Sequence, residues 1–300
     1  MKQILLFISR CLNLLSPTLN TRLFYFYKKR KWPNLKNPKT FDEKISWLKL
    51  YKYNESDLIA RCADKYLVRE YLIEKGLGHL LNDLYGVYDK PEDIDWENLP
   101  NQFIIKWNMS SRKYIICRDK KTLNIEKTIK TLKKMKKIKK YLSSSELHYG
   151  KTPPKLIIEK LLLEKDGSLP LDYKFHSYSG LTKHVMLATE RGTGNPKFYY
   201  FDRDWNFLRI NRDSKSVPND FEFNKPDKLD EAFEYANILS EGFPFVRVDF
   251  YILDKKIIFG ELTFTPGAGA NLLGGEWTHE TDNYFGNFID LDDDVTKNFV

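Results

Sequence analysis

The sequence has few cysteines and few histidines, and this scarcity excludes several kinds of site. Its three cysteines, Cys11, Cys62 and Cys117, are far apart and odd in number. Such spacing suits neither a disulfide framework nor a thiolate metal site, and it favours a reducing compartment. The five histidines show no recognisable metal-ligand spacing, and no convincing nucleophile-base arrangement is present. The chemistry of this protein therefore has to rest on other side chains.

Apolar runs long enough to span a bilayer are also missing at the N-terminus. The run within residues 1–15 is interrupted by Arg10, and no small-residue cleavage site follows it. With the basic cluster 28–31 behind it, the segment could lie on an anionic membrane surface as an amphipathic helix, but we expect a helix packed on the body. We therefore expect a cytoplasmic protein, with peripheral contact at the inner face of the cell membrane as the alternative.

The sequence shows no internal repeat and no low-complexity linker. Its 300 residues, with 42% hydrophobic and 15% aromatic content, can bury a large core, which predicts one elaborated domain or two closely packed lobes. The net charge of +8 favours a polyanionic partner without identifying it. Lysines fill the surface of an expected helix over residues 124–142, where they form either a solvated face or a polyanion-binding face.

The periodicity of apolar residues predicts an α+β fold. Thr40 and Glu43 have the spacing of a capping box, which predicts a helix that begins directly after Thr40. A second helix is expected from Leu58 to Lys75, ending at Gly76, and a third helix over residues 229–240. Expected strands cover residues 83–88, 102–107, 113–118, 156–163, 173–177, 183–189, 198–201, 245–253 and 256–262.

Four polar side chains interrupt the last two expected strands. Alternation places Arg247 and Asp249 on one face of the first strand, and Glu261 and Thr263 on one face of the second. Buried carboxylates are costly unless a cation meets them, and Mg²⁺ binds oxygen ligands alongside substrate phosphates. Asp249 and Glu261 are therefore metal candidates. Arg247 either pairs with these carboxylates or holds a phosphoryl group or a developing oxyanion.

Several longer segments occur together in one order along the chain. They are NPKTFDEK at 37–44, CADKYLVREY at 62–71, LPNQF at 99–103, DYKF at 172–175 and the stretch from Gly242 to Gly267. In this order they resemble the TupA-like branch of the ATP-grasp enzymes, part of a wider group that includes D-alanine-D-alanine ligase. The resemblance covers most of the chain.

The resemblance implies an ATP-grasp fold, in which two lobes with antiparallel or mixed sheets grip a nucleotide. A short helical N-terminal segment would occupy residues 1–58, and the ATP-grasp domain residues 59–290. Within that domain the small lobe would cover about residues 100–160 and the catalytic lobe about 161–290. The N-terminal segment is short for a separate substrate domain.

The resemblance also implies ATP and Mg²⁺ as cofactors and assigns roles to particular residues. Asp249, Glu261 and Thr263 would hold the metal, with Thr263 standing where many relatives place an asparagine. Arg247, Lys106 and Lys174 would take part in catalysis. The nucleotide would contact Lys65, Lys106, Ser110, Ser111, Glu159, Lys160, Leu162 and Asp172.

One loop departs from the family pattern. After the strand that carries Lys106, relatives have a glycine-containing loop, whereas this chain reads Asn-Met-Ser-Ser-Arg at 108–112. Glycines let backbone N–H groups approach phosphate oxygens, and the side chains here restrict that approach. Ser110, Ser111 and Arg112 could contact phosphate instead, or the loop is degenerate.

The resemblance implies an ATP-dependent carboxylate-amine ligase that acts through an acyl phosphate. Its partners would be an amine and an acidic sugar or polymer unit of a bacterial capsule or surface polysaccharide, with no nucleic acid. Two alternatives remain at this stage. One is a glycosyltransferase that uses the weak DxD pattern Asp202-Arg203-Asp204, which also fits a polar hairpin turn. The other is a non-catalytic protein of the same fold that binds polymer or membrane.

Overall fold

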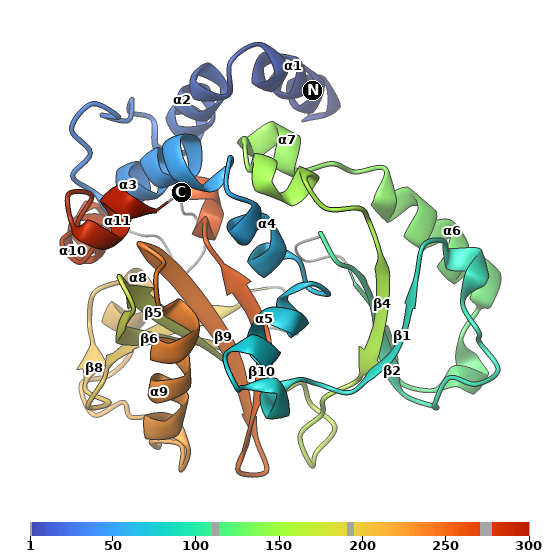
Figure 1. Ribbon diagram of the computed structural model, residues 1–300. Coiled ribbons are helices and arrows are strands. Elements are labelled where there is room, and N and C mark those ends of the chain that lie inside the picture. The colour runs from blue at the N-terminus through green and yellow to red at the C-terminus, as the bar shows by residue number, and fades with distance from the viewer. Residues whose placement is uncertain (1, 110–113, 191–194, 271–277, 300) are drawn as a thin grey trace.

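The computed structural model describes residues 2–109, 114–190, 195–270 and 278–299, and the side chains from residue 9 onwards. Two antiparallel sheets dominate these residues, and helices cover their outer faces (Figure 1). Helices α1 and α2 lie together at one end of the molecule, away from the turn between β9 and β10. This arrangement confirms the predicted α+β class with a helical N-terminal region. No helix in the described part of the chain is long and apolar enough to cross a membrane.

The small sheet has four strands in the order β1-β4-β2-β3. Its strands are β1 (Leu84–Tyr88), β2 (Phe103–Trp107), β3 (Tyr114–Cys117) and β4 (Leu156–Lys160). Strands β2 and β3 pair antiparallel, with Phe103 opposite Cys117. Strand β4 ends at Lys160 rather than at residue 163, and β1 precedes the range expected for the small lobe. The division of the chain into domains stays a prediction.

Helix α6 (Ile125–Lys136) packs on the small sheet, where the Trp107 indole donates to the Leu132 carbonyl at 3.0 Å. The expected helix over 124–142 is wrong in its last part, because α6 ends at Lys136 and α7 (Tyr141–Ser144) is separate. Lysines crowd residues 136–140, all of which are exposed, so like-charge repulsion acts there without any compensating burial.

The large sheet has six strands in the order β10-β9-β5-β6-β7-β8. They are β5 (Asp172–Tyr178), β6 (Leu181–Thr189), β7 (Lys197–Asp202), β8 (Phe207–Leu208), β9 (Phe245–Leu253) and β10 (Lys256–Thr263). Helix α9 (Leu229–Ser240) covers one face, where Phe233 meets Phe175 edge to face with ring centroids 5.0 Å apart. The predicted bounds of α9 and β9 match the structure.

The N-terminal region is continuous with the core of the large lobe from Phe41 onwards. Helices α1 (Lys2–Leu15) and α2 (Pro17–Lys29) precede α3 (Phe41–Leu48), which continues as a π-helix over Lys49–Tyr53. The Thr40–Glu43 capping box is confirmed. Phe41 is fully buried against Phe245 at a centroid distance of 5.0 Å and also contacts Phe285.

The expected helix from Leu58 to Lys75 is wrong, because the structure has two helices there. Helices α4 (Asp57–Ala63) and α5 (Val68–Glu74) are separated by a turn at Asp64. Its Oδ1 accepts hydrogen bonds from the backbone N–H groups of Tyr66 at 2.8 Å and Leu67 at 3.1 Å. Side-chain acceptors of this kind compete with the backbone hydrogen bonds of a helix. The turn that results directs the side chain of Lys65 toward β10.

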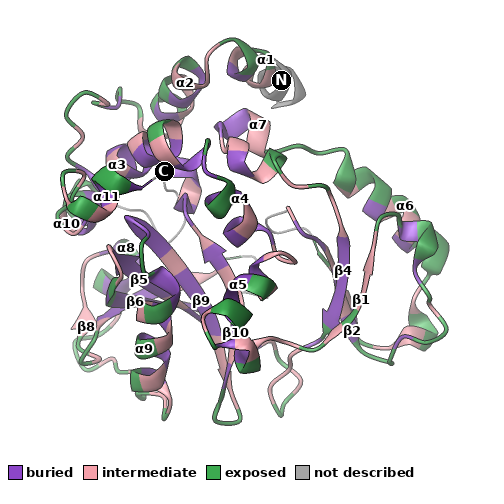
Figure 2. Cartoon of the chain, in the orientation of Figure 1, coloured by how far each residue is buried: buried purple, intermediate pink, exposed green. Residues whose placement is uncertain are grey.

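The remaining helical elements are short connections. They are α8 (Arg212–Lys215), α10 (His279–Gly286), α11 (Asp294–Asn298) and the 3-10 turns Gly78–Leu80, Pro91–Asp93, Lys120–Thr122, Leu147–Gly150 and Pro266–Gly269. Figure 2 shows that β4, β5 and β9 are mostly buried, while α6 is largely exposed.

Candidate functional site

The antiparallel hairpin of β9 and β10 brings four polar side chains together. Its register places Arg247 opposite Thr263 and Asp249 opposite Glu261, with an irregularity between Phe259 and Glu261. A Cβ on Gly260, between those two residues, would lie 3.0 Å from the Asp249 carbonyl oxygen, which explains why glycine fits this position. The convergence predicted from strand alternation is therefore present.

Arg247 binds Asp249 through two hydrogen bonds. Its Nε donates to Asp249 Oδ1 at 2.6 Å and its Nη2 donates to Asp249 Oδ2 at 2.7 Å. The same Nη2 donates to Thr263 Oγ1 at 3.1 Å and lies 3.5 Å from Glu261 Oε1. Asp249 is buried, so this planar fork compensates a carboxylate that would otherwise be costly.

Strand β5 adds a cation beside this pair. Its register sets Lys174 opposite Asp249, and the Lys174 Nζ lies 2.5 Å from both Asp249 Oδ2 and Asp172 Oδ2. Asp172 is buried, so it is not the weak surface ion pair that its sequence context alone allows. Lys174 therefore bridges two buried carboxylates from neighbouring strands.

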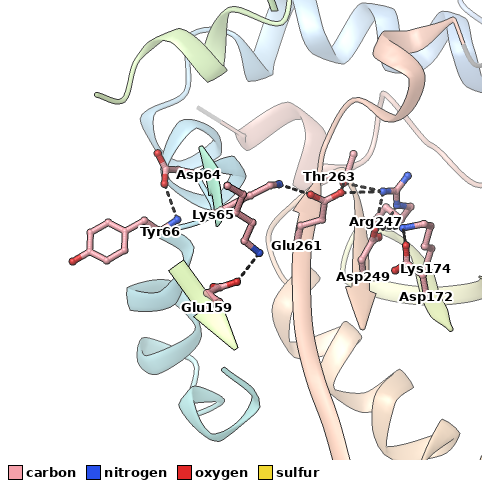
Figure 3. A network of polar contacts seen from close by, with 11 residues as sticks. Asp64, Lys65, Tyr66, Glu159, Asp172, Lys174, Arg247, Asp249, Glu261 and Thr263 are labelled. Atoms are coloured by element: carbon pink, nitrogen blue, oxygen red, sulfur yellow. Dashed lines mark hydrogen bonds and ion pairs between the residues drawn. The ribbon is translucent and has the colours of Figure 1, made fainter. Parts of the chain in front are cut away.

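Lys65 reaches the same cluster from the turn between α4 and α5. Its Nζ lies 2.5 Å from Glu261 Oε2 (Figure 3). The turn is anchored from two sides, because Asp64 Oδ2 accepts from Asn108 Nδ2 at 2.6 Å and from Thr152 Oγ1 at 2.7 Å. Sequence reasoning missed Asp64 and Asn108, and the only signal for Asp64 was its position next to Lys65 in the 62–71 segment.

Lys106 forms a second ion pair on the small sheet. Its Nζ lies 2.6 Å from Glu159 Oε2, and Glu159 is buried. Arg69 from α5 also approaches Glu159, at 3.7 Å, and sequence analysis did not single it out. Figure 3 shows Glu159 on one side of Lys65 and Glu261, with Arg247 and Asp249 on the other side.

The other residues assigned to the nucleotide lie farther along the chain segment that links the two sheets. Lys160 is exposed and lies 3.3 Å from Asp83, and Leu162 is half-buried. A cavity of about 370 Å³ borders both of them. A second, of about 400 Å³, borders Lys160 and Leu161, and neither cavity is lined by Asp249 or Glu261. Ser110 and Ser111, together with Arg112, lie outside the described residues.

Opposite charges balance in the central cluster. Three cations, Lys65, Lys174 and Arg247, face the carboxylates of Asp172, Asp249 and Glu261. Burial alone would raise the pKa of Glu261, but Lys65, Lys174 and Arg247 outweigh it and hold that pKa well below its ordinary value. The Glu261 carboxylate is therefore ionised at neutral pH, as a metal ligand has to be.

The donor set of the cluster suits a hard cation that shares its coordination with phosphates. Asp249, Glu261 and Thr263 offer only oxygen atoms, and Mg²⁺ in phosphate-transfer sites is held by one or two carboxylates plus substrate phosphates and water. A cluster of three or more His, Cys, Asp or Glu side chains able to enclose a metal is not found in the described part of the chain. The residues fit magnesium bound together with a nucleotide.

The DxD pattern and His176 both make contacts that support the fold. Asp202 Oδ1 accepts from the backbone N–H groups of Asp204 and Asn206, at 3.0 and 2.8 Å, so the DxD pattern forms the turn between β7 and β8. His176 is buried and stacks on Phe285 at a centroid distance of 5.7 Å. Burial, together with Arg247, lowers the pKa of His176 well below its ordinary value, which keeps the imidazole neutral.

The chain was compared with known proteins. Three similar solved structures are D-alanine–D-alanine ligase from Bacillus anthracis (17% identity, 69% of this chain and 58% of that chain covered, TM-score 0.42), D-alanine–D-alanine ligase from Helicobacter pylori (16%, 83% and 69%, 0.43) and L-amino acid ligase from Bacillus licheniformis (11%, 77% and 51%, 0.47). No curated protein sequence matches the chain. The family model described as TupA-like ATPgrasp matches residues 43–290. Because the match covers most of the chain, the chain belongs to the TupA-like ATP-grasp family.

Proposed function

We propose that this protein is an ATP- and Mg²⁺-dependent ligase that joins a carboxylate to an amine through an acyl phosphate. The observation that carries the proposal is the cluster in which Lys65, Lys174 and Arg247, from three separate parts of the chain, surround Asp249 and Glu261. Such a cluster can exchange its internal ion pairs for contacts with phosphate oxygens and a metal. Membership of the ATP-grasp family is consistent with this chemistry.

The proposed reaction needs no nucleophile from the protein. A substrate carboxylate oxygen attacks the γ-phosphorus of ATP, which releases ADP and forms the acyl phosphate. An amine then attacks the acyl carbon, phosphate leaves with the bonding electrons, and the amine loses a proton to solvent. Magnesium bound by Asp249, Glu261 and Thr263 would neutralise phosphate charge.

The residues of this chain are proposed to bind and orient the reactants. Lys106 and Lys174 hold phosphate oxygens, and Arg247 donates to the oxyanion that forms on the acyl carbon. Lys65, which already lies against Glu261, contacts the phosphates next to the metal. Glu159, Lys160 and Leu162 are proposed to receive the adenine and Asp172 to lie beside the ribose, while Ser110 and Ser111 cover the phosphates.

We further propose that the carboxylate belongs to an acidic sugar or polymer unit of a bacterial capsule or surface polysaccharide. Support comes from membership of the TupA-like branch, whose resemblance implies such a substrate. The proposed location is the cytoplasm, where ATP is supplied, with contact at the inner face of the cell membrane.

Thermal unfolding with and without Mg-ATP tests the nucleotide site. A ligand that binds only the folded state raises the melting temperature, so wild-type protein should be stabilised. Glu261→Gln and Lys106→Ala should lose most of this shift, while Glu126→Gln and Lys134→Ala, at exposed positions of α6, should keep it. Absence of a shift in the wild type at saturating nucleotide would contradict the proposal.

Release of ADP tests the reaction itself. Mixtures of uronic acids and amines are screened for ADP formation that requires both substrates. The proposal expects turnover by the wild type and none by Glu261→Gln. ADP release that is independent of the amine, or an unchanged rate in both Glu261→Gln and Lys106→Ala, would reject the assignment of the site.

A further inference from the structure

The positive charge of this protein is concentrated in its first 41 residues. That segment contains nine Lys and Arg residues and no Asp or Glu: Lys2, Arg10, Arg22, Lys28, Lys29, Arg30, Lys31, Lys36 and Lys39. The whole chain has 49 basic and 41 acidic residues, so the remaining 259 residues carry 40 basic against 41 acidic. The net charge of +8 therefore belongs to the N-terminal segment, and the rest of the molecule is close to neutral.

The inner face of the hairpin formed by α1 and α2 is mostly polar, because Asn20 and Thr21 are buried there together with Tyr25. Asn20 Nδ2 donates to the Ser143 carbonyl at 3.3 Å and to Ser145 Oγ at 2.9 Å. Ser9 Oγ donates to Asn20 Oδ1 at 2.7 Å and to the Ser143 carbonyl at 2.8 Å. Asn13 is buried as well. Hydrogen bonds to α7 and the residue after it thus hold the hairpin on the body.

The outer face of the same hairpin exposes large apolar side chains among basic ones. Leu14 is 78% exposed and Leu15 84% exposed, at the junction between the two helices. Of the sixteen large hydrophobic side chains that are exposed in the described part of the chain, six fall within residues 14–32: Leu14, Leu15, Leu19, Phe26, Tyr27 and Trp32. Phe26 and Trp32 stack at a centroid distance of 4.6 Å. The hairpin therefore exposes several large apolar side chains, although Tyr25 of α2 is fully buried.

We infer that the α1–α2 hairpin docks on the surface of an anionic lipid bilayer. Basic side chains attract anionic headgroups, and the exposed Leu, Phe and Trp side chains insert at the boundary between headgroups and acyl chains. Exposed Arg22 lies on the same side of α2 as Leu19 and Phe26, at helical spacing, and exposed Arg30 follows directly at the C-terminal end of the helix, so both interactions act in one region.

Other occupants fit this surface less well. A soluble polyanion would use the basic side chains but would leave the exposed leucines in water. A second copy of the chain would bring two segments of the same charge together, which costs free energy. A bilayer satisfies the apolar and the basic side chains at once. The inference deepens the proposed location, and it does not depend on the ligase chemistry.

Binding to vesicles tests the inference with the full-length protein. Co-sedimentation is measured with phosphatidylcholine vesicles that contain phosphatidylglycerol and with vesicles of phosphatidylcholine alone. We expect at least about tenfold tighter binding to the anionic vesicles, and this binding should weaken as salt is added. Equal binding to both kinds of vesicle, or none to either, would overturn the inference.

The apolar contribution is tested with a matched pair of triple variants. One replaces Leu14, Leu15 and Leu19 by Gln, and the control replaces Ile73, Leu181 and Ile238, which are exposed elsewhere, by Gln. The N-terminal variant should bind anionic vesicles at least about tenfold more weakly, and the control should bind like the wild type. Unchanged binding of the N-terminal variant, with retained binding to soluble dextran sulfate, would assign the surface to a polyanion instead.

The charge contribution has its own matched pair. One variant replaces Arg22, Arg30 and Lys31 by Gln, and the control replaces Lys134, Lys137 and Lys139 at and just after the end of α6. Both remove three positive charges, so a difference between them reports the position of the charges. Loss of vesicle binding only in the control would move the docking surface to α6 and overturn the inference.

The N-terminal variants also separate this inference from the proposed function. Both should keep the stabilisation by Mg-ATP and the ADP release of the wild type with soluble substrates, because their residues lie outside the carboxylate cluster. Trp32 gives a direct readout of insertion. Lipids with brominated acyl chains should quench tryptophan fluorescence in the wild type, and most of this quenching should disappear in Trp32→Phe. Equal quenching in both proteins would contradict insertion at this face.

Discussion

Lys65 and Glu261 are separated by 196 positions in the chain, and their Nζ and Oε2 atoms lie 2.5 Å apart. One residue belongs to a turn between two helices and the other to the edge strand of the large sheet. The contact joins the turn between α4 and α5 to the hairpin that carries Arg247 and Asp249. The ion pair between Lys65 and Glu261 also favours the ionised form of Glu261. Its contribution can therefore be measured from the dependence of stability on pH.

Acid should weaken the folded state through Glu261. Its pKa is lower in the folded protein than in the unfolded chain, so the stability it contributes is complete above its unfolded pKa, about 4.3, and is lost as pH falls further. Partial exposure of Glu261 screens its ion pair with Lys65, so the pair contributes up to about 1 kcal/mol to the free energy of unfolding. Urea unfolding between neutral pH and about pH 3 should show a smaller loss for the variant Lys65→Met/Glu261→Gln than for the wild type. Parallel pH profiles would contradict this.

Asp64 should act through the position of Lys65. Asp64→Ala removes acceptors for two backbone N–H groups and for Asn108 and Thr152, so we expect a loss of about 2–4 kcal/mol in the free energy of unfolding. Stabilisation by Mg-ATP should fall as well. Asp64→Asn keeps one acceptor but turns an N–H₂ group toward Asn108, so it should lie between alanine and wild type in urea unfolding. A variant that lost stability without weakening nucleotide binding would refute the positioning role.

Lys49 should make stability rise with pH in mildly alkaline solution. The side chain is fully buried, and its Nζ donates to the carbonyl oxygens of Ser144 at 2.9 Å and Ala268 at 2.8 Å. Burial lowers the pKa of Lys49 to about 8, against the opposing effect of Glu146. Between that value and the ordinary pKa of about 10.4, the unfolded chain binds more protons, so deprotonation favours the folded state.

A comparison with Lys49→Met isolates this effect from other groups that titrate in the same range. The stability of the wild type relative to the variant should increase by roughly 3 kcal/mol from pH 8 toward pH 10.5. Urea unfolding at several pH values measures the difference. A relative stability that stayed flat or fell would show that the Lys49 pKa is not lowered.

The turn between β7 and β8 should tolerate loss of its second aspartate. Asp204 is exposed, while Asp202 accepts three hydrogen bonds within the turn. Asp204→Ala should leave stability and ADP release unchanged, and Asp202→Ala should cost about 1–2 kcal/mol. Thermal unfolding and the ADP assay check both. Sugar-nucleotide turnover by the wild type that Asp204→Ala abolishes would favour the glycosyltransferase alternative.

The elements with regular side-chain alternation could be predicted from the sequence. The hairpin that carries Arg247 and Glu261 has a period of two and a tight turn, so the faces of its side chains follow from local geometry. The break at Asp64 could not be predicted in this way. Apolar spacing over residues 58–75 is compatible with one helix, and the local hydrogen bonds of Asp64 are held in place by Asn108 and Thr152, which are distant in sequence.

Partners of the site residues were harder to predict than the residues themselves. Burial of Glu159 beside Lys106 and Arg69 depends on how α5 packs against the small sheet, and no sequence spacing encodes that packing. Likewise, the end of α6 at Lys136 follows from the absence of packing beyond it. The roles of Lys106, Lys174 and the three metal candidates stay predictions, because contacts alone do not identify a ligand.

Phe41 leaves the ribosome long before its core partners Phe245 and Phe285, whereas the described core of the small lobe is formed by residues between 88 and 158. Domains fold as their residues emerge, so the small lobe can form during synthesis, whereas the apolar face of α3 stays unpacked until Phe245 and Phe285 have been made. Stalled chains with Leu171 outside the ribosome should protect the small lobe from protease and leave residues 41–53 cleavable. Helix α3 is therefore made early, but the core around Phe41 is completed late.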